Sequence, residues 1–414
     1  MLTIDADALK EDRGALRLLA WAGGIFVVLT AINYVWTISW TPGIPRDATT
    51  LVVGRDFLNF WMPGVAAWMS DPGRFYDPQI YHDALSAFLG PDYPGQNWTY
   101  PPGIMLVMAP LGRLPYLAAL GCWTVLGLAV FVWVLSRSVE HRWALVPILL
   151  SPAVLFCLIC GQVSLFTAAM LLTILAGLDR RPLLAGVLIG VLTLKPQLGL
   201  LFPVLLAASG RWRVFVTAAV TGLAIAAAAT VVLGAQVWSD FVLKGLPVQN
   251  LILDDPLRLA TLYHPTIFTN LHAIGMGYGA AMAVQACFAA FGVGAVFFAY
   301  RFRRDADPRL LAALFLACSI CAVPYFSSYD AVAITCVAVM LLETGKLDAP
   351  GRVLAKLVYF LPVLQIALGT WHIPGPALIP PAFAAYLLMR LIFAGETVSG
   401  WALPFAGRRA ANMS

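Results

Sequence analysis

The stretch LLAGVLIGVLTLKPQLGLLFPVLLAA, from Leu183 to Ala208, decides the fold of this chain. It is apolar and long enough to cross a bilayer, which takes about 20 residues, but Lys195 and Pro196 interrupt it. Proline removes a backbone donor, and a lysine in the middle of the hydrocarbon is costly. Two arginines border each end, Arg180 and Arg181 before it and Arg211 and Arg213 after it. We therefore predict two half-helices that enter the membrane and return to the same side.

The rest of the chain has the same apolar character. Of 414 residues, 61% are hydrophobic and 11% are charged, and the mean hydropathy is +0.83, whereas soluble domains carry about 25% charged residues. Apolar runs predict further helices near 15–38, 116–136, 143–159, 163–178, 213–233, 281–301, 309–323, 328–342, 353–370 and 374–394. With the hairpin, these runs predict an all-α, polytopic transmembrane bundle of roughly 11 to 13 helical passes, formed by residues 1–414 as a single integral membrane domain.

The basic residues support the hairpin and orient the bundle. With both termini in the cytoplasm, all but seven of the 26 Lys and Arg residues fall on the cytoplasmic side, as expected for an inner (plasma) membrane protein. The seven on the outer side are Arg46, Arg55, Arg74, Arg113, Lys195, Lys244 and Arg258. A single span over 183–208 would instead move the cluster from Arg301 to Arg309 outside.

Two long segments, 40–115 and 234–276, then lie outside the cell. The first contains amphipathic pieces at 60–69 and 75–89, which we expect to lie flat at the membrane interface. Their interfacial aromatic side chains would be Trp61, Trp68, Phe75, Tyr76 and Tyr81. Such helices would form the wall of a site that faces lipid.

Asp56 is the strongest candidate for chemistry among the outer acids. It lies in Gly54-Arg55-Asp56-Phe57, just before an apolar run and beside a cation. A carboxylate there can serve as a general base that deprotonates a hydroxyl. The alternative is a structural N-cap for a helix that begins near Phe57.

Lys195 and Asp330 are the next candidates. Lys195 is either a snorkelling anchor or a cation offered to an anionic group, because half-helix ends commonly frame binding sites. Asp330 has three interpretations: it caps the following span, orients a sugar, or balances the charge of Lys195. Gln162 lies in a short turn and is a possible sugar contact, and His264 is either an ordinary polar residue or part of the site.

Several kinds of site have no support in the sequence. There is no P-loop, no dinucleotide-binding glycine pattern, no nucleophile elbow and no metal-binding histidine pair. Asp-x-Asp is missing from the outer loops, so we expect neither a metal nor a cofactor. We interpret the spaced pairs Cys157/Cys160 and Cys318/Cys321 as apolar packing residues.

An ordered series of short motifs resembles a known family. The series begins with Arg55-Asp56-Phe57, Phe75-Tyr76-Asp77, Tyr100-Pro101-Pro102 and Met108-Ala109-Pro110-Leu111. It continues with Gly161-Gln162-Val163-Ser164, Leu194-Lys195-Pro196-Gln197, Gly210-Arg211-Trp212-Arg213 and Ser328-Tyr329-Asp330. Over about residues 50 to 335 the chain resembles glycosyltransferase family 87, among the C-type membrane glycosyltransferases that use polyprenyl-phosphate sugars.

The resemblance implies an inverting, mannosyltransferase-like reaction on the outer side of the membrane. By motif position Asp56 would be the catalytic base. The donor would be a hexose on a polyprenyl phosphate, and the acceptor a glycolipid or glycan, with no nucleic acid involved. Residues expected to bind donor or acceptor are Arg55, Lys195, Gln197, Gln162, Tyr100, His264, Tyr329 and Asp330.

Two other functions share some of these features. A secondary transporter or lipid flippase would also have a broken hairpin with a buried lysine, but the other half of the sequence shows no related second hairpin. A noncatalytic partner in envelope assembly would tolerate changes at Asp56 and Lys195. The long aromatic-rich outer loop favours an enzyme over both.

Overall fold

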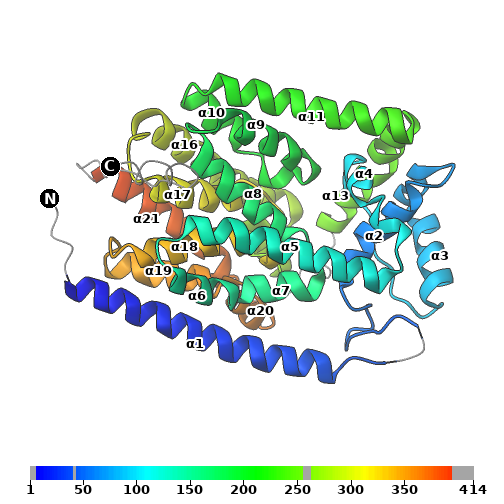
Figure 1. Cartoon of the computed structure of the whole chain (residues 1–414), viewed down its shortest axis with the longest axis horizontal. Coiled ribbons are helices and arrows are strands. Elements are labelled where there is room, and N and C mark those ends of the chain that lie inside the picture. The colour runs from blue at the N-terminus through cyan, green and yellow to red at the C-terminus, as the bar shows by residue number, and fades with distance from the viewer. Residues whose placement is uncertain (1–5, 41–42, 255–262, 394–414) are drawn as a thin grey trace, which may run out of the picture.

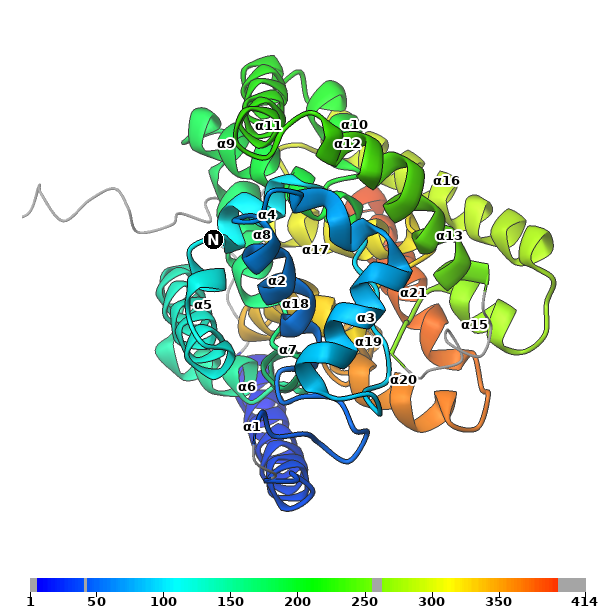
Figure 2. The ribbon, with the colours of Figure 1, turned by 90° about the vertical axis from the view of Figure 1, so that its right-hand side faces the viewer.

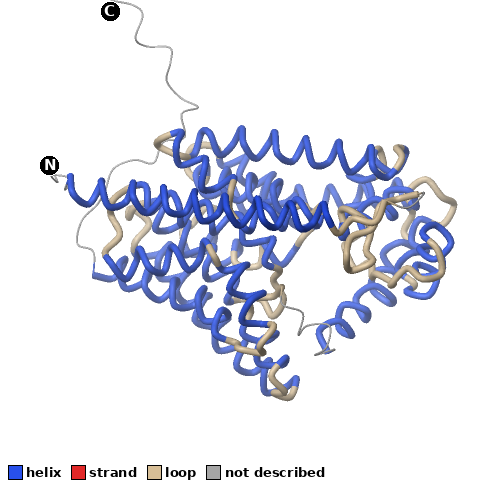
Figure 3. The backbone as a smooth tube through the Cα atoms, turned by 90° about the horizontal axis from the view of Figure 1, so that it is seen from below, coloured by secondary structure: helices blue, strands red, loops and turns tan. Residues whose placement is uncertain are grey.

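The computed structural model describes residues 6–40, 43–254 and 263–393. Within these ranges the chain is built of helices and contains no strand (Figure 3). The predicted all-α class is confirmed, and several helices are apolar and long enough to mark a membrane protein.

Among the described residues, five helices are long and apolar enough to cross a membrane by themselves. They are α1 (Ala6–Trp36, apolar from Arg13), α5 (Tyr116–Ser138), α11 (Trp212–Leu233), α16 (Tyr278–Phe302) and the segment Gly375–Phe393, which contains α21 (Ile379–Phe393). Two further candidates are bent pairs. α6 (Leu145–Leu149) meets α7 (Pro152–Cys160) at 55°, and α19 (Ala349–Tyr359) meets α20 (Leu361–Gly369) at 67°. Each pair bends beside a proline, Pro152 or Pro362, which breaks the ladder of backbone hydrogen bonds.

The remaining predicted spans are shorter helices inside the bundle. α8 (Ser164–Gly177), α17 (Pro308–Cys321) and α18 (Val332–Glu343) contain 14, 14 and 12 residues. Every residue of α18 is buried, and α17 and α18 lie among the other helices (Figure 1). Every predicted run is therefore helical. By length and composition, however, five to seven helices in the described ranges qualify as spans, fewer than the 11 to 13 passes predicted.

The predicted hairpin is present. It consists of α9 (Pro182–Val191), two short 3-10 turns (Leu192–Leu194 and Pro196–Leu198) and α10 (Phe202–Ala208). α9 lies parallel to α11, because Gly186 and then Gly190 lie against Thr217 and then Thr221. Asp179, before the hairpin, accepts hydrogen bonds from Arg211, after it, at 2.9 and 2.7 Å. The chain thus returns to the end of the bundle from which it entered, and Lys195 lies at the tip.

The segment predicted to be the first outer loop folds into a compact unit across one end of the bundle, called the outer unit below (Figure 2). It contains α2 (Leu58–Ala66), α3 (Pro78–Leu89) and α4 (Gly103–Met108), with 3-10 turns at Arg55–Phe57, Pro72–Tyr76 and Leu111–Arg113. Four of the five aromatic residues predicted to face the interface, Trp61, Phe75, Tyr76 and Tyr81, are buried in a hydrophobic cluster of this unit, and Trp68 is 55% exposed. These large rings bury one another, so they pack inside the unit instead of facing lipid.

The second outer segment packs against the first. After α11 it forms α12 (Gln236–Asp240), a π-helical turn (Phe241–Gly245) and α13 (Leu246–Asp254), and it continues at residue 263 into α15 (Ile267–Ala273). The rings of Tyr76 and Phe241 lie 5.5 Å apart between centroids. The part of the predicted 234–276 loop at 255–262, with Arg258, lies outside the described residues.

Candidate active site

Four segments that are far apart in sequence meet where the outer unit contacts the bundle. They are the 3-10 turn Arg55–Phe57, the turn at Gly161 and Gln162 between α7 and α8, the hairpin tip at Lys195, and the 3-10 turn η8 (Ser328–Ala331) before α18. Hydrogen bonds, an ion pair and a cation–π contact connect their side chains.

Asp56 interacts with the bundle through its carboxylate. Its Oδ2 accepts a hydrogen bond from Gln162 Nε2 at 2.9 Å, and the same Nε2 lies 3.1 Å from the hydroxyl of Tyr329. Asp56 lies inside its 3-10 turn, and the cap residue of α2 is Phe57, with no side-chain cap hydrogen bond. The carboxylate therefore faces the cluster and does not serve as an N-cap.

Burial governs the protonation of Asp56. Desolvation raises its pKa above the ordinary aspartate value, while hydrogen bonds from Gln162 and Tyr329 and the positive charges of Arg55 and Lys195 act in the opposite direction. A carboxylate with a raised pKa is a stronger base than a free aspartate at any pH at which it stays ionised.

Two glycines allow the turn that carries Asp56 to touch the turn that carries Gln162. Gly54 precedes the first turn at φ +85°, and Gly161 ends α7 in the left-handed region at φ +62°. A Cβ on Gly161 would lie 2.6 Å from Phe57 Cβ and 2.8 Å from the Gly54 carbonyl oxygen. Only glycine combines that conformation with so close an approach. The Trp123 indole also donates to the Gly161 carbonyl at 3.1 Å.

Arg55 turns toward a second acid. Its Nε donates to Asp47 Oδ2 at 2.5 Å, and the Asp47 side chain is 1% exposed. Asp47 Oδ1 accepts from the Thr49 amide at 2.8 Å, which fixes the carboxylate. Arg55 is thus held beside Asp56 by a different carboxylate. Asp47 was not singled out in the sequence, because an acid in a loop eight residues away gives no local signal of this contact.

Lys195 and Asp330 form a buried ion pair. Lys195 Nζ lies 2.5 Å from Asp330 Oδ1, with side chains 5% and 2% exposed. Ser164 Oγ donates to the same oxygen at 2.6 Å, and Nζ lies 5.4 Å from the centre of the Tyr329 ring. Of the three interpretations of Asp330, the structure shows charge balance with Lys195. Lys195 does not snorkel, since its ammonium group points into the bundle.

Tyr100 belongs to the same cluster. Its ring packs against Phe60 and Trp98, with centroids 5.0 and 5.4 Å apart. Burial raises the pKa of the Tyr100 hydroxyl, and the negative charges of Asp330 and Asp56 raise it further. Both carboxylates therefore act electrostatically on this hydroxyl, which remains protonated.

His264 packs against the segment just before η8, through Tyr325 and Ser327. Its Nδ1 is 3.3 Å from Ser327 Oγ, and its ring packs against Tyr325 with centroids 4.4 Å apart and an interplanar angle of 38°. Burial lowers the pKa of His264 to about 4, so the imidazole is neutral at pH 7. Asn270 Nδ2 donates to its carbonyl at 2.8 Å and secures the segment.

One predicted site residue stays apart. Gln197 is partly exposed beyond the hairpin tip, and in the described part of the chain it forms no hydrogen bond with the cluster. Ser164 was missed as a site residue although it ends the quoted motif Gly161-Gln162-Val163-Ser164. In residues 6–40, 43–254 and 263–393 no group of three His, Cys, Asp or Glu side chains is placed to hold a metal ion.

The arrangement combines a carboxylate of raised pKa with a lysine ammonium paired to Asp330, whose carboxylate also accepts a hydrogen bond from Ser164. Such a pair can accept a proton on one side and stabilise a developing anion on the other.

Comparison with known proteins identifies the family. The family model described as Glycosyltransferase family 87 matches residues 98–328, more than half of the chain. The match includes Tyr100, Gln162, Lys195 and His264, and it begins after Asp56. No curated protein and no solved structure matches the chain. This membrane protein therefore belongs to glycosyltransferase family 87.

Proposed function

We propose that this glycosyltransferase transfers a hexose, mannose, from a polyprenyl-phosphate sugar to a hydroxyl of a glycolipid or glycan outside the cell, with inversion. The protein would lie in the plasma membrane with both termini in the cytoplasm. The observation that carries the proposal is the meeting of Asp56 with the Lys195–Asp330 pair through Gln162 and Tyr329.

Asp56 is the proposed base. The acceptor oxygen would form a bond to the anomeric carbon while the bond from that carbon to the phosphate oxygen breaks. The proton of the acceptor hydroxyl would pass to Asp56, and the electron pair of the broken bond would stay on the polyprenyl phosphate. Attack opposite the leaving group inverts the anomeric centre. Gln162 would keep the Asp56 carboxylate aimed, since its amide donates to Oδ2.

Lys195 is the proposed partner of the leaving phosphate. Its ammonium is compact and carries three donors, of which Asp330 occupies one position. Asp330 would hold the ammonium in place, and the hydrogen bond from Ser164 would fix the Asp330 carboxylate. Arg55 contacts Asp47 through Nε, which leaves the terminal amino groups of its guanidinium to face a second phosphate oxygen.

The uncharged residues would bind the sugars. Tyr100 and Tyr329 offer protonated hydroxyls next to the carboxylates. His264, neutral at pH 7, can donate or accept toward a sugar hydroxyl. Gln197 lies beyond the hairpin tip and would contact substrate only outside the present cluster.

The test is transfer of radiolabelled mannose from polyprenyl-phosphate-mannose to a total membrane lipid extract. Wild type and Asp56→Asn would be assayed side by side, with Asp83→Asn as the matched control, because Asp83 is an exposed aspartate of the same outer unit. We expect labelled product from wild type and Asp83→Asn, and a loss of about 10²- to 10⁴-fold in Asp56→Asn.

The outcomes separate donor from base. Full activity in an Asp56→Asn protein with wild-type thermal unfolding would remove Asp56 from the proposed role. Activity of wild type with a different polyprenyl-phosphate sugar, and none with mannose, would keep the mechanism and change the sugar. The mass of the labelled product would identify the acceptor.

A further inference from the structure

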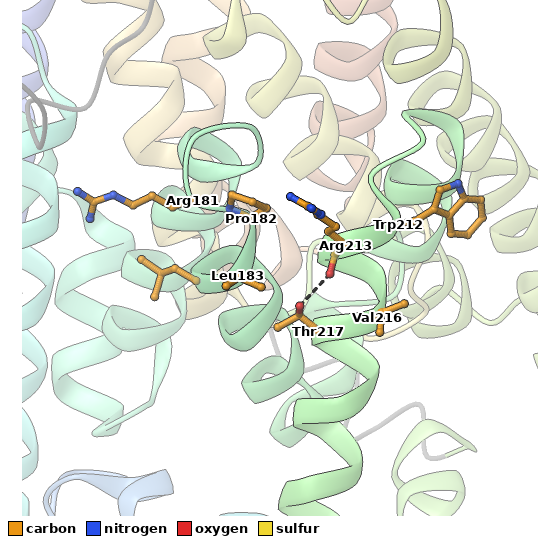
Figure 4. A pocket seen from close by; sticks show the side chains of 8 residues that line it. Arg181, Pro182, Leu183, Trp212, Arg213, Val216 and Thr217 are labelled. Atoms are coloured by element: carbon orange, nitrogen blue, oxygen red, sulfur yellow. Dashed lines mark hydrogen bonds between the residues drawn. The ribbon is translucent and has the colours of Figure 1, made fainter.

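The base of the hairpin, at the opposite end of α9 from Lys195, borders a large open groove. It lies between the first turns of α9 and α11 and has a volume of about 990 Å³. Leu183 and Val216 form part of its wall and are 66% and 57% exposed. Arg213 lines the same groove, and its carbonyl accepts a hydrogen bond from Thr217 at 2.8 Å (Figure 4).

A second groove lies on the other side of α9. It runs between α5, α8 and α9, has a volume of about 240 Å³, and is lined mostly by apolar side chains such as Trp133, Met170 and Leu188. Arg181 and Leu184 line both grooves. The first turn of α9 is therefore a ridge with an apolar groove on each side.

Two arginines lie beside these grooves. Arg181 lines both of them, and Arg213 lines the larger one. In Figure 4 Arg181 and Arg213 extend on different sides of the first turn of α9. The neighbouring acid, Asp179, is already bound by Arg211 through two hydrogen bonds, so it does not neutralise Arg213. Trp212, 59% exposed at the rim, is a residue type enriched at membrane interfaces.

We propose that this ridge binds one anionic phospholipid, with its phosphate beside Arg181 and Arg213 and one acyl chain in each groove. The charge of the arginines suits a phosphodiester, and two grooves separated by a single helix turn suit two chains. A free phosphate would use the arginines alone, and an uncharged lipid would use the grooves alone. The bound lipid would tie α9 to α5 and α11 and thereby fix the base of the hairpin.

The test uses delipidated full-length protein titrated with phosphatidylglycerol and followed by native mass spectrometry. The compared protein carries Arg181→Gln and Arg213→Gln together. The matched control carries Arg17→Gln and Arg301→Gln, which removes two exposed arginines that line neither groove. We expect wild type and control to bind one lipid, and the affinity of the Arg181/Arg213 variant to fall about tenfold or more.

A second variant tests the grooves without changing charge. Val216→Trp fills part of the larger groove from an exposed position, so we expect weaker phosphatidylglycerol binding with unchanged thermal unfolding of the lipid-free protein. Phosphatidylcholine should bind weakly, and inorganic phosphate should not raise the unfolding temperature. Equal phosphatidylglycerol binding by the Arg181/Arg213 variant and its control would overturn the proposal. Stabilisation of wild type by inorganic phosphate as large as that by the lipid would also overturn it.

Discussion

The two ends of the hairpin carry ion pairs that differ in their exposure to solvent. At the tip, Lys195 is buried and paired with Asp330, and Ser164 donates a hydrogen bond to the same Asp330 oxygen. At the base, the Arg211–Asp179 pair joins side chains that are 14% and 75% exposed. A buried pair leaves an uncompensated charge when one partner is lost, whereas an exposed pair is replaced by water. The same element therefore carries a charge with a buried partner at one end and a charge with an exposed partner at the other.

The largest effect should follow from removing the buried cation. Lys195→Met leaves Asp330 without its partner, and we expect a loss of about 3 to 5 kcal/mol in unfolding free energy together with loss of transfer activity. Thermal unfolding in detergent measures the first and the mannose transfer assay the second.

The matched double variant, Lys195→Met with Asp330→Asn, removes both charges. It should recover most of the stability and none of the activity. A double variant no more stable than Lys195→Met would mean that the ion pair is not the source of the loss.

The next largest effect should follow from a substitution where the turn carrying Asp56 touches the turn carrying Gln162. Gly161→Ala places a Cβ against Phe57 and the Gly54 carbonyl at a φ of +62°, which should cost about 2 kcal/mol or more. Because the two turns must separate, transfer activity should fall with stability. Gly210→Ala is the control, since Gly210 has a similar φ of +68° with no atom within 4 Å of an added Cβ. Equal costs in the two variants would show that strain, not the close approach, matters.

The protonation of Asp56 gives a smaller, pH-dependent effect. Activity should fall about tenfold per pH unit below its raised pKa, because the protonated acid cannot accept a proton. The free energy of unfolding depends on pH in the opposite direction from activity. Between the ordinary and the raised pKa the folded state binds more protons than the unfolded state, so stability declines as pH rises through this window.

Asp56→Asn should abolish that decline and unfold no earlier than wild type at neutral pH. Unfolding curves of both proteins across acidic to neutral pH provide the comparison. A wild-type protein that gains stability relative to Asp56→Asn as pH rises would contradict the role of burial.

The smallest effect should come from the base of the hairpin. Arg211→Gln removes the hydrogen bonds to Asp179, an exposed pair, and should cost no more than about 1 kcal/mol. Thermal unfolding at low and high salt measures it, and added salt should shrink the difference. A loss of unfolding free energy as large as that of Lys195→Met would contradict the proposed difference between the buried pair at the tip and the exposed pair at the base.

Much of the fold follows from local pattern. A lysine and a proline in the middle of an apolar run predict the hairpin, and every apolar run became a helix. The number of complete spans and the position of the aromatic residues did not follow. An apolar residue gives the same sequence signal whether it faces lipid or another helix. The sequence of the wholly buried α18 therefore predicts a membrane span. In the same way, Tyr76 and Tyr81 read like interfacial residues although they are buried.

The site was predictable in its residue types but not in its contacts. Asp56, Gln162 and Lys195 stand out because polar groups are rare near apolar runs. Gln162 and Asp56 are 106 residues apart. No local sequence pattern indicates that the Gln162 amide contacts both Asp56 and Tyr329. The Lys195–Asp330 pair was one of three alternatives, and only the packing of the hairpin against η8 selects it. The Arg55–Asp47 pair gave no signal at all.

The ion pair at the hairpin tip also dictates an order of events during synthesis. Lys195 is made 135 residues before Asp330, a delay of about 7 to 27 seconds at the usual rate of translation. During that interval the ammonium lacks the carboxylate that pairs with it in the folded bundle. Its two arms are each too short to cross the bilayer alone. We therefore expect the nascent hairpin to settle into the bundle only after the segment carrying Asp330 has emerged from the ribosome.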